Sequence, residues 1–288
     1  MALNWWLAIL LGALQGFTEF LPISSSGHLV LAQHYLGFEE EAGASALFFD
    51  GMLHLGTLVA VVLYFGREAL RSVDPGRGAS SGDGPARMPI ALMSWLRLGL
   101  LVGLASVPAT VVALAASDHI KDSFRNPLMV ACSFLVLGFV LLLSDRLRHG
   151  DTDLARMTWW QALLVGCGQA LSAVFRGLSR SGMTITAALA VGLDRAWAVR
   201  FSFLMSMVAS LGLGGLGIVK ALRDPSRDHW LTPDFMGLTL LATAVSAVVG
   251  YLSIAPLIRL VRAARLWWFS LYLWSIGLAV LATHWWAG

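Results

Sequence analysis

The stretch from Gln15 to Leu29, QGFTEFLPISSSGHL, constrains the fold more than any other part of this chain. It lies in an otherwise apolar N-terminal region, yet it contains Glu19, Pro22, three consecutive serines and His28. The proline removes a backbone donor and disfavours helix at the residue before it, and the serines offer the backbone competing hydrogen bonds. A helix that begins near Leu3 is therefore expected to break here, with its freed polar groups facing protein or water rather than lipid.

The composition of the whole chain indicates an integral membrane protein. Hydrophobic residues make up 57% and charged residues 13% of the 288 positions, and the mean hydropathy is +0.73, outside the usual balance of soluble proteins. This length holds about six spans of about 20 residues each, within one membrane domain over residues 1–288. The net charge of +3 does not indicate nucleic-acid binding, because the arginines are scattered over short loops as membrane orientation requires.

The order of apolar and polar segments predicts the helices. Residues 3–21 and 27–36 are each too short to span a bilayer, so we expect a re-entrant helix, a break and a second helix. A flexible loop is expected at about 67–94, where Gly, Ser and Pro are dense. Cys132 and Cys167 are expected to be small buried hydrophobes. Full spans are expected at 47–65, 95–116, 128–144, 197–222, 236–258 and 266–286.

The two halves of the chain look like a repeat. Residues 159–182, WWQALLVGCGQALSAVFRGLSRSG, share with the opening stretch a glutamine, an apolar run and the pattern S-x-S-G. The fold class predicted is an all-α membrane protein in which repeats at about 1–144 and 159–288 each contain a broken helix pair and three transmembrane helices. Because three is odd, the second copy is inverted, which brings the two breaks together near the bilayer midplane.

The loops on the two sides of this topology differ in arginine content. The arginine-rich side is expected to be cytoplasmic, so both termini and the first broken helix face outward. The arginine-rich loops contain Arg67, Arg71, Arg77, Arg87, Arg146, Arg148, Arg156, Arg259, Arg262 and Arg265, and the opposite loops contain Lys121, Arg125, Arg223 and Arg227.

A pocket between the two breaks would combine a carboxylate (Glu19), a hydroxyl (Ser25), an imidazole (His28) and a guanidinium (Arg180). This set suits phosphate, because a guanidinium matches phosphate oxygens bidentately and hydroxyls and helix-start amides add donors. Glu19 could hold a divalent cation or act as a base towards Ser25 or water, and His28 could act as acid or base. The other residues expected to bind substrate are Gln15, Ser24, Ser26, Gly27, Arg176, Gly177, Ser179, Ser181 and Gly182.

Each of these residues also has a structural interpretation. The three serines can cap the resumed helix, and His28 can be a satisfied interior histidine. Arg180 needs an anionic partner at membrane depth, which is either Glu19 in an ion pair or a substrate phosphate. We favour the anion site, since a simple ion pair needs no hydroxyl and glycine neighbours. Asp50 and His54, one turn apart near the start of the first full span, either line the site or lie at the membrane interface.

These motifs resemble the undecaprenyl pyrophosphate phosphatases of bacteria, also called bacitracin-resistance proteins. The block from Gln15 to Leu29 is similar to the first signature of that family, and RGLSRSG at 176–182 is similar to the second. FDGMLHLGTLVAVVLYF at 49–65 and RFSFLMS at 200–206 also look like family segments, so the resemblance spans nearly the whole chain.

The resemblance implies that the protein removes the terminal phosphate from undecaprenyl pyrophosphate released by cell-wall polymerisation. It also implies a divalent cation (Mg²⁺ or Ca²⁺), a multi-pass location in the bacterial inner membrane, and a site open to the periplasmic side. The oligomeric state is left open, with a homodimer as one alternative. The family's functional carboxylate, serine, histidine and arginine carry over to Glu19, Ser25, His28 and Arg180.

Three positions depart from the family pattern. Gln15 stands where many members have Glu, Arg176 replaces a proline, and residues 207–209 lack an expected proline. The competing function is secondary transport of an anionic solute or lipid, because inverted repeats with broken helices also describe transporters. A transporter, however, needs no serine beside a histidine and releases no phosphate.

Overall fold

The computed structural model describes residues 3–37, 44–73, 92–115, 126–147, 150–175 and 177–287, and these ranges are built from helices. Within them, the only extended pairing is an isolated bridge between Thr152 and Leu193. The helices are α1 (Trp5–Phe20), α2 (Ser25–Tyr35), α3 (Ala44–Val73), α4 (Leu92–Ala115), α6 (Pro127–Ser144), α7 (Trp159–Val174), α8 (Arg180–Ala190), α9 (Arg195–Arg223), α10 (Arg227–Trp230), α11 (Pro233–Arg262) and α12 (Trp267–Ala287).

Five of these helices, α3, α4, α6, α9 and α11, are long and apolar enough to cross a membrane. They coincide with five of the six predicted spans, so the prediction of an all-α integral membrane protein is confirmed. The sixth predicted span corresponds to α12, whose 21 residues are long enough to cross. Tryptophans, a tyrosine and a histidine interrupt its apolar residues, and α12 is not among the five helices that length and composition mark as candidate spans.

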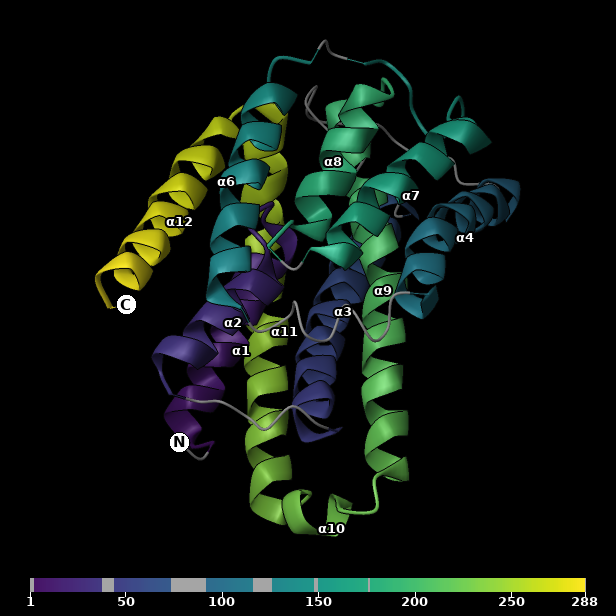
Figure 1. The fold of residues 1–288 in the computed structure, drawn as a ribbon. Coiled ribbons are helices and arrows are strands. Elements are labelled where there is room, and N and C mark those ends of the chain that lie inside the picture. The colour runs from purple at the N-terminus through teal and green to yellow at the C-terminus, as the bar shows by residue number, and fades with distance from the viewer. Residues whose placement is uncertain are drawn as a thin grey trace.

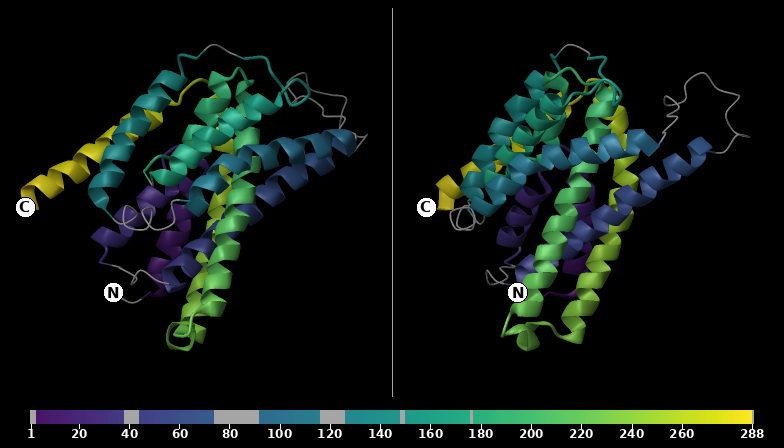
Figure 2. Two further views of the ribbon diagram at one scale, coloured as in Figure 1. Left: turned by 45° about the vertical axis from the view of Figure 1, so that its right-hand side comes forward. Right: turned by 90° about the vertical axis from the view of Figure 1, so that its right-hand side faces the viewer.

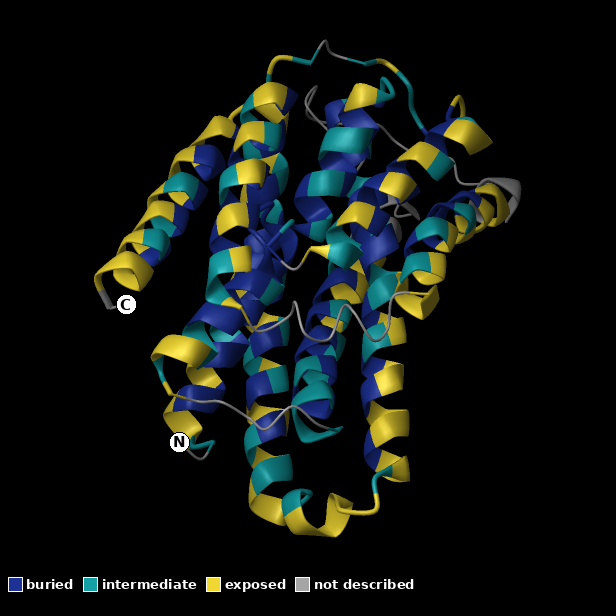
Figure 3. Cartoon of the chain, in the orientation of Figure 1, coloured by how far each residue is buried: buried dark blue, intermediate teal, exposed yellow. Residues whose placement is uncertain are grey.

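The helices form a bundle in which α3 packs against both α9 and α11, and α1 packs against α11 (Figure 1). α6 pairs with α12, and this pair leans away from the long helices in Figure 2. Small residues allow close contact: a Cβ added at Gly12 would lie 2.4 Å from the carbonyl oxygen of Ala242, and one at Gly16 would lie 2.5 Å from that of Ser246. Buried residues face inward and exposed ones face outward along each long helix, as expected for a bundle surrounded by lipid (Figure 3).

The predicted break in the first helix is present between Phe20 and Ser25. α2 begins two residues before the expected Gly27, because the hydroxyl of Ser24 accepts a hydrogen bond from the amide of Gly27 at 3.2 Å and caps the helix. Ser24 has a φ of 71°, an unusual value for a non-glycine residue that turns the chain sharply between the two helices.

The second broken helix is built in the same way. α7 ends at Val174, α8 begins at Arg180, and the hydroxyl of Ser179 accepts a hydrogen bond from the amide of Gly182 at 3.1 Å. α1 and α2 enter the bundle from the lower end in Figure 1, whereas α7 and α8 enter from the upper end. The two breaks therefore meet inside the molecule.

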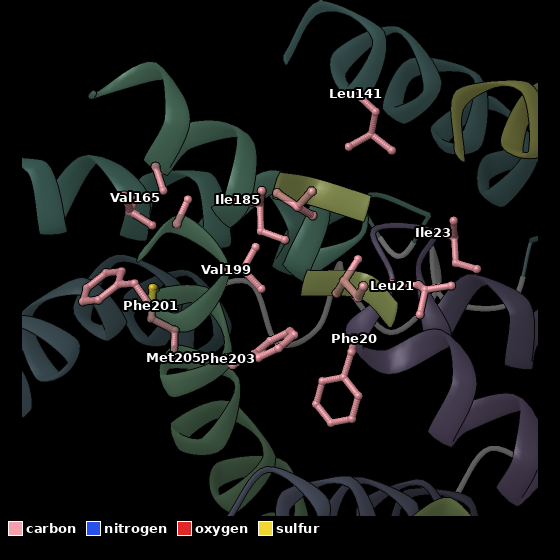
Figure 4. Close-up of a cluster of buried hydrophobic side chains, with 14 of the residues drawn as sticks. Phe20, Leu21, Ile23, Leu141, Val165, Ile185, Val199, Phe201, Phe203 and Met205 are labelled. Atoms are coloured by element: carbon pink, nitrogen blue, oxygen red, sulfur yellow. The ribbon is translucent and has the colours of Figure 1, made fainter. Parts of the chain in front are cut away.

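Apolar side chains support the meeting point of the breaks (Figure 4). Phe20, at the end of α1, packs edge-on against Phe203 of α9 with ring centroids 5.2 Å apart. Leu21 and Ile23 of the first break belong to the same buried cluster as Ile185 of α8. The cluster joins elements from both halves of the chain, so it holds the two breaks in register.

The structure corrects two expectations, and some of the expected site and loop residues lie outside the described residues. Cys132 and Cys167 are exposed rather than buried, because both lie on outward faces of their helices. α3 continues to Val73 and α4 begins at Leu92, so the helices extend into the expected loop at 67–94, whose remaining residues are not described. Arg176 and the loop residues Arg77, Arg87, Lys121, Arg125 and Arg148 also lie outside the described residues.

Candidate active site

The carboxylate of Glu19, at the end of α1, is the centre of a polar cluster. Ser25 donates a hydrogen bond to Oε2 of Glu19 at 2.6 Å, and Nε2 of Gln15 donates to the same oxygen at 3.0 Å. Arg180 forms an ion pair with Oε1, and Nδ1 of His54 lies 3.5 Å from that oxygen. Side chains from α1, α2, α3 and α8 thus converge on one buried carboxylate.

Arg180 connects the two broken helices. Its side chain is 23% exposed, whereas that of its partner Glu19 is 2% exposed. The hydroxyl of Ser181, next to Arg180, donates to the carbonyl oxygen of Leu21 at 2.9 Å. Of the two anionic partners considered for Arg180, the structure contains the ion pair with Glu19, and the guanidinium is the more accessible member of that pair.

His54 belongs to this cluster. Besides its contact with Glu19, its Nδ1 lies 3.2 Å from Nε2 of Gln15. The sequence left open whether Asp50 and His54 line the site or lie at the interface, and the structure places His54 in the site. Asp50, one turn earlier on α3, is half-buried.

His28 lies beside the cluster and has partners of its own. Its Nδ1 is 2.7 Å from the carbonyl oxygen of Ser24, and its Nε2 is 2.9 Å from the hydroxyl of Tyr272 on α12. The imidazole is stacked between the rings of Phe134 and Tyr272, at centroid distances of 4.9 Å and 5.6 Å. Because the hydroxyl of Ser25 donates to Glu19, the acceptor for its proton in this structure is the carboxylate rather than the imidazole.

The remaining residues expected to bind substrate surround the two breaks. The hydroxyls of Ser24 and Ser26 lie 3.5 Å apart, and those of Ser179 and Ser181 lie 3.0 Å apart. Gly27, Gly177 and Gly182 occur where the backbone packs tightly. An added Cβ would lie 2.6 Å from the Phe134 ring at Gly27, 2.2 Å from Cβ of Ser133 at Gly177 and 3.0 Å from Leu137 at Gly182.

The donors present fit a divalent cation only if the substrate supplies further ligands. The described residues contain no group of three or more His, Cys, Asp and Glu side chains placed to hold a metal. Glu19 already accepts from several donors, but Oε1 of Gln15 is buried without a hydrogen-bond partner. One carboxylate and one amide oxygen suit Mg²⁺ that is also bound by phosphate oxygens, the usual arrangement in phosphoryl-transfer sites.

Sequence reasoning did not identify Tyr272 as a neighbour of the site. It lies on α12, far from either motif in the chain, and a tyrosine in an apolar helix carries no signal that distinguishes a site residue from an interfacial one. Only the packing of α12 against α6 brings its hydroxyl to His28.

Comparison with known proteins gives matches over almost the whole length. The chain matches the family described as Bacitracin resistance protein BacA over residues 8–279. It is 41% identical over 280 residues to an undecaprenyl-diphosphatase of Trichlorobacter lovleyi, covering 96% of this chain and 95% of the relative. It is also 39% identical to an undecaprenyl-diphosphatase of Alcanivorax borkumensis (97% and 98% covered) and 36% identical to one of Methanobrevibacter smithii (95% of each).

Proposed function

The chain belongs to the bacitracin resistance protein BacA family, and we propose that it is an undecaprenyl-diphosphatase like its curated relatives. It hydrolyses undecaprenyl diphosphate to undecaprenyl phosphate and inorganic phosphate, which recycles the lipid carrier for cell-wall synthesis. The observation that carries this proposal is the contact of Ser25, Glu19 and Arg180 where the two broken helices meet. In this cluster Ser25 supplies the nucleophile, Glu19 the base, and the guanidinium of Arg180 the positive charge that binds phosphate.

In the proposed reaction, the terminal phosphate displaces Glu19 from Arg180. A guanidinium binds phosphate oxygens bidentately, and Arg180 is the accessible member of the ion pair. Loss of the guanidinium makes the carboxylate a better proton acceptor at the moment when the proton of Ser25 must leave. Substrate binding therefore activates the base.

The oxygen of Ser25 then forms a bond to the terminal phosphorus, and the bond from that phosphorus to the bridging oxygen breaks. Undecaprenyl phosphate leaves, and Glu19 holds the proton of Ser25. Glu19 gives that proton to the leaving undecaprenyl phosphate and then accepts a proton from the water that attacks the phosphoserine. The bond between phosphorus and the oxygen of Ser25 breaks, and Glu19 returns the proton to this oxygen. A divalent cation would be held by the amide oxygen of Gln15 and the phosphate oxygens of the substrate, and by Glu19 only while its carboxylate does not carry the proton of Ser25. It would neutralise charge on the diphosphate.

Phosphate release by the purified protein tests this function. We expect purified protein to release one phosphate per molecule of undecaprenyl diphosphate, and a chelator to reduce the rate if the cation is required. A secondary transporter would release none. Absence of phosphate release with Mg²⁺ or Ca²⁺ supplied would remove the phosphatase assignment.

We also propose that the two halves are inverted copies and that the arginine-rich loops are cytoplasmic. The asymmetry of the arginines supports this orientation. In a chain with Cys132 and Cys167 replaced by serine, single cysteines at Ala263 and Gly82 should resist a membrane-impermeant thiol reagent in intact cells. A cysteine at Ser226, on the exposed turn before α10, should react. The reverse labelling pattern would contradict the topology, and labelling of all three after cell lysis controls for thiol reactivity.

A further inference from the structure

A groove of about 500 Å³ lies next to the second break, outside the polar cluster. One wall is formed by Met129, Cys132 and Val136 of α6, and the other by Phe175 and Leu178 of the segment between α7 and α8. The volume is within the range of small-molecule sites, about 300–1,000 Å³. Among the described lining residues only Asn126 and Ser133 are polar, so this part of the groove suits a hydrocarbon.

Both walls of the groove belong to segments that also build the phosphate site. Leu178 directly precedes Ser179, the cap of α8, and is two residues from Arg180. Gly177 packs against Ser133, another residue of the lining. On another face of α6, Phe134 stacks on His28. Both walls of the groove therefore lie within a few residues of side chains that belong to the two breaks.

We propose that this groove binds the first isoprene units of the polyprenyl chain and so aligns the diphosphate with Ser25. The proposal rests on the proposed function, because it assigns a place to the chain of that substrate. Several lining residues are open to the surroundings, among them Phe175 at 41% and Val136 at 53% exposed. A chain can thus enter sideways from the bilayer while its diphosphate stays at the breaks.

The groove acts by positioning and contributes little to total binding energy. Lipid tails are as apolar as the groove, so an isoprenoid chain gains little hydrophobic free energy on leaving the bilayer. What the groove supplies is a fixed direction for the chain, which keeps the reacting phosphorus in line with the nucleophile. Filling the groove should therefore harm long-chain substrates and leave a chainless diphosphate unaffected.

Cys132→Trp fills the groove, and Cys167→Trp is its matched control, since both cysteines are exposed but only Cys132 lines the groove. For Cys132→Trp we expect kcat/KM for undecaprenyl diphosphate to fall about tenfold. Its activity on methyl diphosphate, which has no isoprene unit, should stay within about twofold of the parent. Cys167→Trp should match the parent with both substrates. An unchanged kcat/KM for the long substrate, or an equal loss with both substrates, overturns the proposal.

Photocrosslinking of the unaltered protein gives a second reading that does not depend on how a variant folds. An undecaprenyl diphosphate analogue with a photoreactive group on its first isoprene unit should label peptides from α6 and from residues 175–178, and excess undecaprenyl diphosphate should abolish the labelling. Labelling of other helices refutes the groove assignment. So does equal labelling by a phospholipid that carries the same photoreactive group, if undecaprenyl diphosphate does not displace it. If phosphate release is absent altogether, the proposed function fails instead, and the labelling pattern still decides where the chain binds.

Discussion

Replacing Arg180 by alanine should lower the turnover of undecaprenyl diphosphate by at least about a hundredfold, the usual loss when a charge-stabilising donor is removed. The phosphate would lose its bidentate partner. Glu19, whose side chain is 2% exposed, would also lose its cation, and an unpaired buried charge costs about 3–5 kcal/mol of stability. We therefore expect a lower kcat together with a lower thermal midpoint.

Arg180→Lys separates these two effects. A lysine restores a positive charge beside Glu19 and should recover much of the stability, but a point charge does not reproduce the planar fork, so most of the activity should remain lost. Arg156→Ala serves as the control, because this arginine is 61% exposed in its pair with Asp151 and a surface pair contributes little. Near-normal turnover in Arg180→Ala would remove Arg180 from the reaction.

A double substitution distinguishes a catalytic pair from a structural one. Glu19→Gln alone should also lower turnover at least about a hundredfold. If Arg180 and Glu19 served only to neutralise each other, removing both charges would restore stability and activity, since a buried pair is often replaceable by neutral groups. We expect Glu19→Gln with Arg180→Ala to recover stability but to stay inactive. Recovery of activity would favour the ion-pair interpretation.

The parts of the fold that the sequence predicted are those with strong local signals. Pro22 and the serine run predict the first break, because their effect on the backbone needs no distant partner. Five of the apolar spans follow from length and hydropathy alone. The similarity between the two break motifs suggested that they approach each other, and the hydrogen bond from Ser181 to Leu21 is a direct contact between them.

The parts that were missed depend on rotation and packing, which a single sequence does not specify. Whether His54 faces Glu19 or lies at the membrane interface depends on how α3 is positioned against α1, so the sequence alone leaves its role open. Tyr272 reaches His28 only because α12 packs on α6. The outward orientation of Cys132 and Cys167 has the same cause, since apolar residues on either face of a membrane helix look alike in sequence.

The environment of Ser25 bears on the choice between a serine nucleophile and a metal-bound water. A serine needs a base within hydrogen-bonding reach, and its hydroxyl donates to Glu19 at 2.6 Å. The sequence allowed His28 as an acid or a base, but its imidazole is engaged by Ser24 and Tyr272. The base that we expect is therefore Glu19, with His28 fixing the start of α2 against α6 and α12.

Ser25→Ala should then abolish turnover while substrate still binds, and Ser25→Cys should retain at most a trace. His28→Gln should lose less activity than Ser25→Ala, because its ring lies beside the reacting groups and not between them. Acid quench during a single turnover should trap a phosphoenzyme in the parent protein and none in Ser25→Ala. Hydrolysis in oxygen-18 water labels the released phosphate by either route, so trapping is the decisive measurement. Substantial activity in Ser25→Ala without any trapped phosphoenzyme would establish direct attack by water, with Ser25 reduced to a hydrogen-bond donor for Glu19.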